Sequence, residues 1–311
     1  MIDFRDATFE AVDKVMAADP RAMLLTNDMG AMGLDQARQR FPGRVVNVGI
    51  AEQNLMSVAA GLALEGRRVF VFGIASHLTG RAYEQMKLDI CVLGLDVVIL
   101  GVGGGLSYGA DGPTHQALDD LALMRTLPGM AVYNPADGHC ARACILAAVD
   151  AGGPAYVRLD RERLPFLGQD TGFTQGFRLL SAGQSMAVFA TGCMVPVAAS
   201  AVTLLAGGGI NACLVDFYRL HPVDDAAVLA VIADKPLVAT VEEHAPMGGL
   251  GSVLADLANR NGLTPAFSRH AVTGGLALGV SDRAQIRDSN GMTAEALAAC
   301  WLNRLHRGKT C

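Results

Sequence analysis

Short apolar runs alternate along the chain with longer segments in which apolar residues recur every three or four positions. In the first half, the runs "AMLLTND", "RRVFVFG", "DVVILGV" and "AYVRLD" have the continuous apolar character of strands that are buried on both faces. Between such runs, segments such as "AEQNLMSVAAGLALEG" and "ADGHCARACILAAVDAG" have helical spacing. This alternation predicts an α/β fold with a mostly parallel sheet flanked by helices.

The alternation is interrupted by a Pro-, Gly- and Gln-rich stretch, "RLPFLGQDTGFTQGFRLLSAGQ". We therefore predict two domains, at residues 1–165 and 181–311, joined by a linker at 166–180. In the second domain, strands are expected in "MAVFATG", "NACLVDFYRLHP" and "PLVATVEEH", and a closing helix in "TAEALAACWLNRLHR". Each domain is thus expected to contain its own mostly parallel sheet flanked by helices.

Composition narrows the range of partners and compartments. The net charge of −5 over 311 residues does not indicate the basic surface that binds nucleic acid. No apolar run reaches the roughly 18 residues of a membrane span. The N-terminal stretch "MIDFRDATFE" is charged and helical in pattern, unlike a signal peptide. Seven scattered cysteines without a CxxC pair favour buried, reduced thiols over a metal site. We therefore expect a cytoplasmic protein with no metal ligands of its own.

A single carboxylate, Glu52, stands in "VNVGIAEQN" between a strand-like run and a helix-like run. Keeping a carboxylate ionised between two buried elements is costly. One interpretation is structural, because an acidic residue in a first helical turn suits the helix dipole. The other interpretation is that Glu52 exchanges a proton.

Further chemically able side chains follow other predicted strands. The loop "GADGPTHQ" holds Asp111 and His115, and such loops are where parallel sheets bind ligands, although Asp-Gly-Pro also builds a tight turn. "AYVRLDRERLP" places Arg158, Arg161 and Arg163 where a guanidinium could hold an anion or lie in solvent as a rim charge. The upstream "GVGGGLSYG" matches no nucleotide-binding glycine motif, and we expect its glycines to allow close backbone approach to a ligand or a partner chain.

The order and spacing of these segments closely resemble the transketolase family. The resemblance covers essentially the whole chain, as a pyrimidine-binding domain followed by a transketolase C-terminal domain. It rests on "VGIAEQNLMSVAAGLAL", "GRAYEQ", "GADGPTHQALDDLALMRTLPGM", "NPADG", "AYVRLDRERLP" and "VEEHAPMGGLGS". It implies thiamine diphosphate as the cofactor, which carries the difficult chemistry itself. It also implies that Glu52 hydrogen-bonds a ring nitrogen of the aminopyrimidine and so activates the cofactor, and that Asp111 and His115 contact substrate hydroxyls and assist proton transfers.

The resemblance also implies an anion site for the substrate. Arg5 and Arg161 align with arginines that hold the terminal anion of a sugar phosphate. Gly103 and Met32, however, fall where many transketolases have a phosphate-contacting histidine and a helping serine. The anion site is therefore expected to be partly rebuilt, and the substrate need not be an ordinary sugar phosphate.

Around the cofactor, the resemblance implies contacts from Asp28 and from Gln85, which follows the segment that packs on the pyrimidine. The family usually has phenylalanines in the segment equivalent to "FGIASHLTGRAYEQ", and one of them stacks on the ring. In this chain, either His77 supplies the flat face or Leu78 gives only an aliphatic contact.

One expected motif is missing from the sequence. The family holds the cofactor's diphosphate through Mg²⁺, using a GDG motif followed by an asparagine on a separate N-terminal domain, and this chain contains no GDG. We therefore expect a C-terminal subunit of a split transketolase, with the Mg²⁺ ligands on an N-terminal partner subunit, self-association into a dimer, and an α2β2 heterotetramer. The complex would transfer a two-carbon ketol unit from a ketose to an aldose, with small sugars or sugar phosphates as substrates.

Three alternatives remain open. A 1-deoxyxylulose-5-phosphate synthase-like ligase also suits "GADG" and "RAYEQ", although that family normally forms one chain with GDG. A 2-oxo acid dehydrogenase β-type subunit is also split, but "DGPTHQ" followed by "ALDDLALMR" fits transketolases better. A non-catalytic regulatory subunit would need no cofactor, and the joint presence of Glu52, Asp111, His115 and both aligned arginines argues against it.

Overall fold

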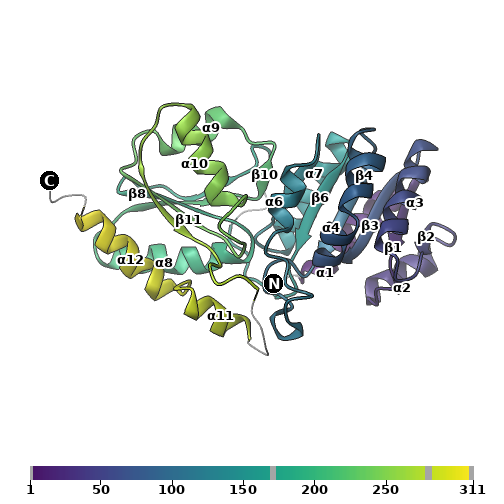
Figure 1. The fold of residues 1–311 in the computed structure, drawn as a ribbon, viewed down its shortest axis with the longest axis horizontal. Coiled ribbons are helices and arrows are strands. Elements are labelled where there is room, and N and C mark those ends of the chain that lie inside the picture. The colour runs from purple at the N-terminus through teal and green to yellow at the C-terminus, as the bar shows by residue number, and fades with distance from the viewer. Residues whose placement is uncertain (1–2, 169–172, 277–281, 308–311) are drawn as a thin grey trace.

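Two α/β domains lie side by side in the computed structural model, which describes residues 3–168, 173–276 and 282–307 (Figure 1). The strands of the first domain are β1 (Ala22–Thr26), β2 (Val45–Asn47), β3 (Arg68–Ile74), β4 (Val97–Val102), β5 (Ala131–Tyr133) and β6 (Ala155–Leu159). Its helical elements are α1 (Phe4–Ala18), α2 (Met32–Arg40), α3 (Glu52–Leu64), α4 (Ala75–Arg81), α5 (Tyr83–Gln85), the π-helical η1 (Met86–Cys91), the 3-10 turn η2 (Gly109–Asp111), α6 (Asp120–Arg125) and α7 (Gly138–Ala151).

The second domain has the same alternating character. Its strands are β7 (Arg178–Ser181), β8 (Met186–Ala190), β9 (Ala212–Asp216), β10 (Arg219–His221), β11 (Leu237–Val241) and β12 (Ala266–His270). Its helical elements are the 3-10 turn η3 (Gly192–Met194), α8 (Val195–Gly207), α9 (Asp225–Ile232), α10 (Leu250–Arg260), α11 (Arg283–Ser289) and α12 (Ala294–Arg307). None of the helices in the described part of the chain is long and apolar enough to cross a membrane.

Both sheets are mostly parallel, which confirms the predicted fold class. The first sheet has the order β10-β5-β6-β4-β3-β1-β2, and its strands from β5 to β2 run parallel. The second has the order β12-β11-β8-β9-β7, and only β7 runs antiparallel to its neighbour. The central strands of both sheets are buried along their whole length, as their continuous apolar sequences predict.

Three strands depart from the sequence-based prediction. The segment "NACLVDFYRLHP" predicts one strand, but only β9 stays in the second sheet, and β10 pairs antiparallel with β5 of the first sheet. The strand β7 lies at the end of the expected linker, and β12 was not predicted. Both are edge strands whose residues are largely exposed or half-buried, so neither has a continuous apolar run to mark it.

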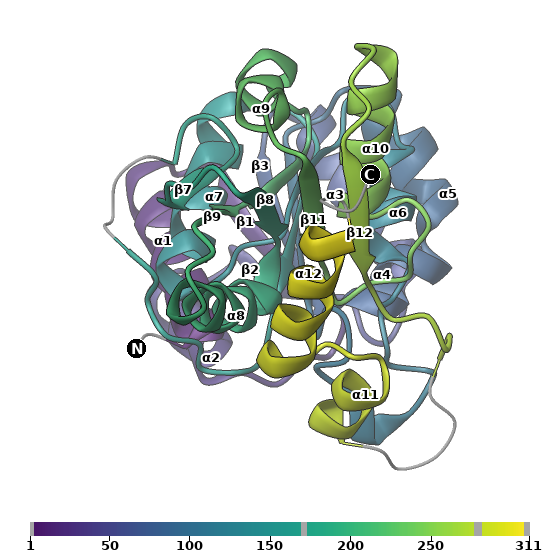
Figure 2. The same ribbon diagram turned by 90° about the vertical axis from the view of Figure 1, so that its left-hand side faces the viewer.

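Helices cover both faces of each sheet. In the first domain, α1 and α7 pack against each other on one face, while α3, α4 and η1 contribute to the core on the other face. In the second domain, α8 and α12 lie next to each other on one face (Figure 2), and α9 and α10 lie on the other. One hydrophobic cluster includes Leu121 and Met124 of the first domain and Leu250 and Leu254 of the second. The two domains therefore share a core.

The segments that follow the parallel strands of the first domain carry its polar, chemically able side chains. Asn27 follows β1, Glu52 follows β2, His77 follows β3, His115 lies in the loop after β4, and Arg161 follows β6. The carboxyl ends of parallel strands meet at one edge of a sheet, where α/β proteins bind ligands. The fold thus brings these residues to one edge.

Candidate active site

The Glu52 carboxylate is buried at the N-terminus of α3, with only 4 % of its residue surface exposed. No side chain caps this helix, and the carboxylate accepts a hydrogen bond from the Glu52 backbone N–H itself. Asn27 Nδ2 donates to Oε1 at 2.9 Å, and Arg81 Nη1 donates to Oε2 at 3.1 Å. Every side-chain partner of the carboxylate is therefore a donor, as an ionised carboxylate requires.

The environment of Glu52 sets its protonation state. Burial raises the pKa of this carboxyl, but the backbone N–H, Arg81 and Asn27 together outweigh burial and hold the pKa below its usual value. In the chain alone, Glu52 is thus an anion at neutral pH. The Arg81 side chain is 56 % exposed, so this partner of the buried carboxylate lies largely outside the core.

Two histidines extend the site away from Glu52. His77 Nδ1 lies 4.0 Å from Glu52 Oε1, and the His77 ring meets the His115 ring edge-on, with centroids 4.9 Å apart. Burial, together with the positive fields of Arg81 and His115, lowers the pKa of His77, so this ring is neutral at physiological pH. Leu78 is fully buried in the core. The structure thus places the His77 ring beside the carboxylate, and the choice between His77 and Leu78 as the contact to the cofactor stays a prediction.

A tyrosine continues this row of rings. The Tyr108 ring meets His115 edge-on at 5.6 Å between centroids, and the guanidinium carbon of Arg161 lies 4.3 Å from the Tyr108 ring centroid. Burial raises the pKa of the Tyr108 phenol, whereas Arg161 and Arg5 act to lower it, so both guanidiniums are close enough to act on the phenol. Tyr108 was not among the predicted site residues. Its signal in the sequence is a lone aromatic residue inside the glycine-rich "GGGLSYGADG".

The structure separates the three arginines of the segment "AYVRLDRERLP", of which Arg158 lies within β6 and the other two follow it. Arg158 is buried, and its Nε lies 2.9 Å from a carboxylate oxygen of Asp120, so it stabilises the fold. Arg163 Nε lies 3.6 Å from Asp3. No carboxylate among the described residues pairs with the Arg161 guanidinium, which lies on the Tyr108 ring instead. Of the three, Arg161 is the one without a carboxylate partner among the described residues, which suits it to bind an anionic ligand.

The second domain fixes the loops that carry Tyr108 and Arg161. Glu243 accepts the Leu106 backbone N–H at 2.7 Å and is paired with Arg283 at 2.8 Å. Arg283 also donates to Asp160 at 2.8 Å, and Asp160 accepts the backbone N–H of Arg161 at 2.7 Å. Burial raises the pKa of the Asp160 carboxyl, but Arg283 and the backbone donors outweigh it and hold the pKa far below its usual value. The Tyr108 and Arg161 loops are therefore anchored to one buried ionic cluster.

The glycine-rich loop packs against the chain itself. A Cβ at Gly103, whose φ is +86°, would lie 1.9 Å from the Tyr108 ring, and one at Gly105 would lie 2.5 Å from the Glu243 carboxylate. The predicted close backbone approach is present. At these positions the chain's own side chains make the approach, and a role of the glycines toward a ligand or a partner chain stays a prediction.

The remaining predicted residues are placed less centrally. Asp28 is exposed and bonded to Asn47, with its backbone N–H at 2.9 Å from Asn47 Oδ1, while the adjacent Asn27 contacts Glu52. Asp111 lies exposed in η2. Gln85 lies in α5, and its Oε1 is buried without a hydrogen-bond partner in the described part of the chain. Asn27 was missed because strand-end geometry decides which residue of "TND" turns inward.

The polar groups at Glu52 fit an aminopyrimidine. Asn27 Oδ1 is buried without a hydrogen-bond partner among the described residues, next to the Glu52 carboxylate. Such a ring offers a nitrogen that can share a proton with a carboxyl and an amino group that needs acceptors. In the described ranges, no group of three or more His, Cys, Asp or Glu side chains is arranged to hold a metal ion. The fit therefore concerns the pyrimidine half of thiamine diphosphate.

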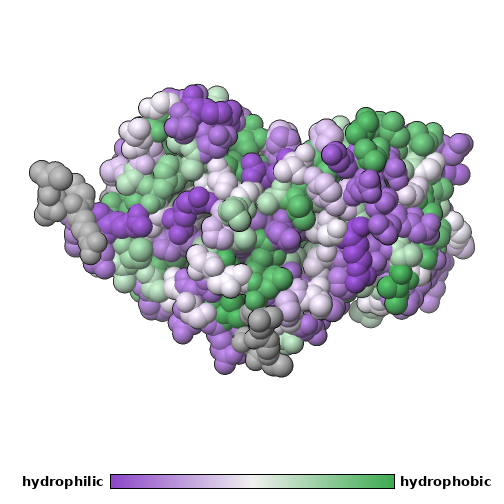
Figure 3. All heavy atoms as spheres, viewed as in Figure 1, coloured by the Kyte–Doolittle hydropathy of each residue, from purple (hydrophilic) through white to green (hydrophobic). Residues whose placement is uncertain are grey.

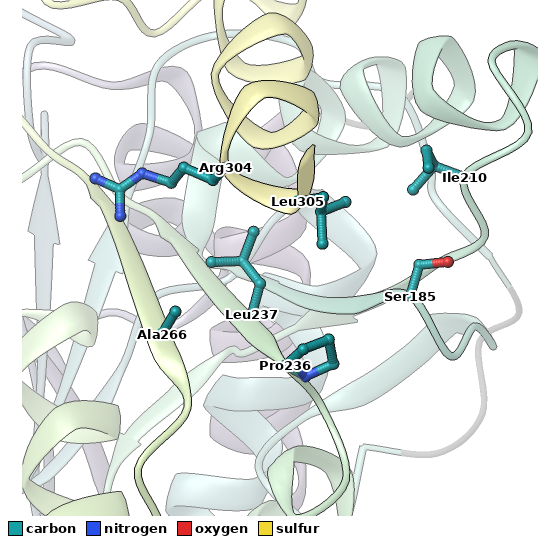
Figure 4. Close-up of a pocket in the computed structure, with 7 residues that line it drawn as sticks. All are labelled: Ser185, Ile210, Pro236, Leu237, Ala266, Arg304 and Leu305. Atoms are coloured by element: carbon teal, nitrogen blue, oxygen red, sulfur yellow. The ribbon is translucent and has the colours of Figure 1, made fainter. Parts of the chain in front are cut away.

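Two of the hollows bear on the location of the site, one where the two domains meet and one on the second domain alone. One, of about 330 Å³, lies beside the histidines, and its lining includes Ser76 and Gly80 of α4, Thr114 of the "GADGPTHQ" loop and Ala245 of the second domain. The other, of about 280 Å³, is mainly apolar and lies where strands of the second sheet begin, lined by Ser185, Ile210, Pro236, Leu237, Ala266, Arg304 and Leu305 (Figure 4). Parallel sheets bind ligands at the opposite, carboxyl end of their strands, which favours the first hollow.

Comparisons with known proteins agree with this arrangement. The transketolase pyrimidine-binding domain matches residues 1–166, and the transketolase C-terminal domain matches residues 176–295. The chain is 36 % identical over 262 residues to one of the subunits of the apulose-4-phosphate transketolase of Actinobacillus succinogenes, covering 83 % of this chain and 84 % of that one. It is 34 % identical to the 6-deoxy-6-sulfo-D-fructose transketolase subunit SqwH of Clostridium sp., covering 83 % and 81 %.

A further relative and a solved structure match the chain along nearly its whole length. A 1-deoxy-D-xylulose-5-phosphate synthase of Anaeromyxobacter dehalogenans is 35 % identical, and the match covers 95 % of this chain but 48 % of that protein. A solved split-gene transketolase, described as an inactive β4 tetramer, superimposes with a TM-score of 0.87 at 32 % identity and covers 98 % of both chains. With both domains matched and such relatives spanning most of its length, the chain belongs to the transketolase family.

Proposed function

We propose that this chain is the C-terminal subunit of a split transketolase that transfers a two-carbon ketol unit from an anion-bearing ketose to an aldose. The observation that carries this proposal is the buried Glu52 carboxylate at the start of α3, from which His77, His115, Tyr108 and Arg161 lead away in one row. An activating carboxylate at one end and an anion-binding guanidinium at the other suit a phosphorylated or sulfonated ketose.

Each residue of the row has a role that its environment supports. Thiamine diphosphate, when bound, supplies the nucleophilic carbon and the electron sink. Glu52 holds and shares the proton at the pyrimidine ring nitrogen, while the Asn27 amide fixes Oε1 at 2.9 Å. His77, neutral and half-buried, offers its ring face beside the carboxylate. His115 and Asp111 bind the donor's hydroxyls and pass protons to and from them.

The names of two relatives support an anionic donor. One of these enzymes is named for a sugar phosphate, apulose 4-phosphate, and the other for a sulfonated sugar, 6-deoxy-6-sulfo-D-fructose. In this chain, Arg161 pairs with no carboxylate of the described residues, and Arg5 reaches Asp3 only at 3.8 Å. A guanidinium fork can donate two hydrogen bonds to the oxygens of a phosphate, and it can do the same to those of a sulfonate. The site therefore suits either anion.

The proposed assembly includes a second kind of chain and a second copy of this one. An N-terminal subunit would supply the GDG…Asn site for Mg²⁺ and the diphosphate. Apolar side chains are exposed on or next to α3 and η1, namely Ile50, Leu64, Leu88, Val92 and Leu93. Figure 3 shows hydrophobic surface at the end of the molecule that the first domain forms. Such surface suits burial against a partner chain.

The test is reconstitution with a candidate N-terminal subunit, followed by a donor screen with and without Glu52→Gln. An amide cannot share the proton, so we expect turnover to fall by about a hundredfold or more. The control is Glu65→Gln, at the exposed C-terminal end of the same helix, which should retain turnover. Near-wild-type turnover of Glu52→Gln, with its fold intact by circular dichroism, would refute the assignment.

A second candidate is a decarboxylating ligation of the 1-deoxyxylulose-5-phosphate synthase type. It is favoured by 35 % identity that extends over 95 % of this chain. The two reactions differ in their donor, since the ligase uses a 2-oxo acid and releases carbon dioxide. Offering pyruvate and a ketose separately to the reconstituted complex distinguishes them: release of carbon dioxide from pyruvate, without ketol transfer, would favour the ligase.

A further inference from the structure

The Tyr108 ring lies between the two ends of the candidate site. The Arg161 guanidinium carbon is 4.3 Å from its centroid, and His115 meets it edge-on at 5.6 Å. His115 meets His77 at 4.9 Å, and His77 Nδ1 lies 4.0 Å from Glu52. One uninterrupted row of side chains therefore connects the carboxylate to the guanidinium.

The backbone holds this ring in place. Gly103 has a φ of +86°, and a Cβ there would fall 1.9 Å from Tyr108 Cε2. The ring thus occupies the space that any side chain at position 103 would need, and Gly103 and Tyr108 form one packing unit. Leu106, two residues before Tyr108, is in turn fixed by its hydrogen bond to Glu243 at 2.7 Å. The ring is a rigid platform built from both domains.

The Arg161 side chain depends on this platform. It is exposed, and no carboxylate of the described residues holds its guanidinium. An exposed arginine loses considerable rotamer freedom when it binds an anion. Stacking on an aromatic face removes part of that freedom in advance and leaves the in-plane N–H groups free to donate. A stacked guanidinium is therefore preorganised to bind a phosphate or sulfonate with two parallel hydrogen bonds.

We propose that Tyr108 is a positioning residue that sets donor specificity: by holding the Arg161 guanidinium over its ring, it favours ketoses with a terminal anion over neutral ketoses. This inference rests on the proposed function and deepens it, since it assigns the preference for an anionic donor to a residue that touches the arginine.

The test is the ratio of kcat/KM for D-fructose 6-phosphate to that for D-fructose in the reconstituted complex. Tyr108→Leu should lower this ratio about three- to tenfold, through loss of the stacked contact. Tyr108→Phe keeps the ring and should stay within about twofold of wild type. In an Arg161→Ala background, Tyr108→Leu should have no further effect, because the two residues act through one contact.

A matched control exists elsewhere in the chain. Phe173 lies under the Arg178 guanidinium, with 4.4 Å to the ring centroid. Phe173→Leu therefore removes the same kind of stacked pair at another place, and the donor ratio should not change. Should Tyr108→Leu fail to fold, Tyr108→Met fills the space with an unbranched chain and carries the same expectation.

Two outcomes would overturn the inference while leaving ketol transfer intact. The first is an unchanged donor ratio in Tyr108→Leu, and the second is an equal fall of the ratio with and without Arg161. If the wild-type complex transfers no ketol unit, the proposed function fails separately. The affinity for inorganic phosphate, measured by calorimetry, then decides: weaker binding by Tyr108→Leu than by wild type supports the platform, and equal binding refutes it.

Discussion

Replacing Arg283 should lower the free energy of unfolding of the chain, and it should also loosen the loop that carries Arg161. Its guanidinium, only 9 % exposed, donates to Asp160 at 2.8 Å and is paired with Glu243 at 2.8 Å. Arg283→Met keeps most of the side-chain volume but leaves two buried carboxylates without this cation. Breaking a buried pair from one side costs about 3–5 kcal/mol, because an uncompensated charge remains. We expect a loss in this range at neutral pH.

The loss should depend on pH with a definite sign. The folded pKa of Asp160 lies below its usual value, so the stabilisation from this carboxylate is complete above the unfolded pKa of about 3.9 and is lost as the pH falls below it. In Arg283→Met the carboxyl remains buried without its cation, so its pKa should rise and protonation should relieve the strain. The difference between wild type and variant should therefore be largest near pH 7 and shrink toward pH 4.

Urea unfolding at both pH values provides the assay. Trp301 is the only tryptophan and is fully buried, so its fluorescence reports on the second domain. Arg260→Met is the control, because it removes a surface ion pair with Asp256 and should change stability by less than about 1 kcal/mol. A loss below about 1 kcal/mol for Arg283→Met, or one independent of pH, would refute the assigned role of this cluster.

Two further predictions concern the site itself. Arg81→Met should raise the pKa of Glu52, because the cation 3.1 Å from Oε2 is lost. A pH titration of the labelled carboxyl carbon by NMR measures this pKa. An unchanged pKa would mean that Arg81 does not hold the carboxylate ionised. Arg161→Ala and Arg5→Ala should each raise the KM for an anionic donor by about tenfold or more relative to a neutral donor, since each removes a charge-assisted hydrogen bond. If the two donors respond equally, these arginines are rim charges.

The linear sequence determined the fold class and the family. Continuous apolar runs mark strands buried on both faces, and these runs alternate with helical spacing, so a parallel α/β architecture follows from local patterns alone. The sequence also marked Glu52 as a candidate, because keeping a lone carboxylate ionised between two apolar elements is costly. Loops such as "GADGPTHQ" could also be expected at the site, since loops after parallel strands converge on one edge.

Tertiary structure decided which neighbouring side chain faces the site. Asn27 and not Asp28 reaches Glu52, because successive side chains at the end of a strand point to opposite sides. The residue types alone did not separate the three arginines of "AYVRLDRERLP", and only the family resemblance pointed to Arg161. The structure adds that Arg158 is buried beside Asp120, whereas Arg161 lies on the Tyr108 ring.

The contribution of the second domain was also invisible in the sequence. The strand β10 joins the first sheet, although "NACLVDFYRLHP" has the pattern of one strand, because strand pairing depends on partners far along the chain. Glu243 and Arg283 lie 137 and 123 residues from the Leu106 and Asp160 groups that they fix. Local periodicity carries no information at such separations. The sequence therefore determined which residues form the motifs. The contact between the domains determined how the loops that carry them are held.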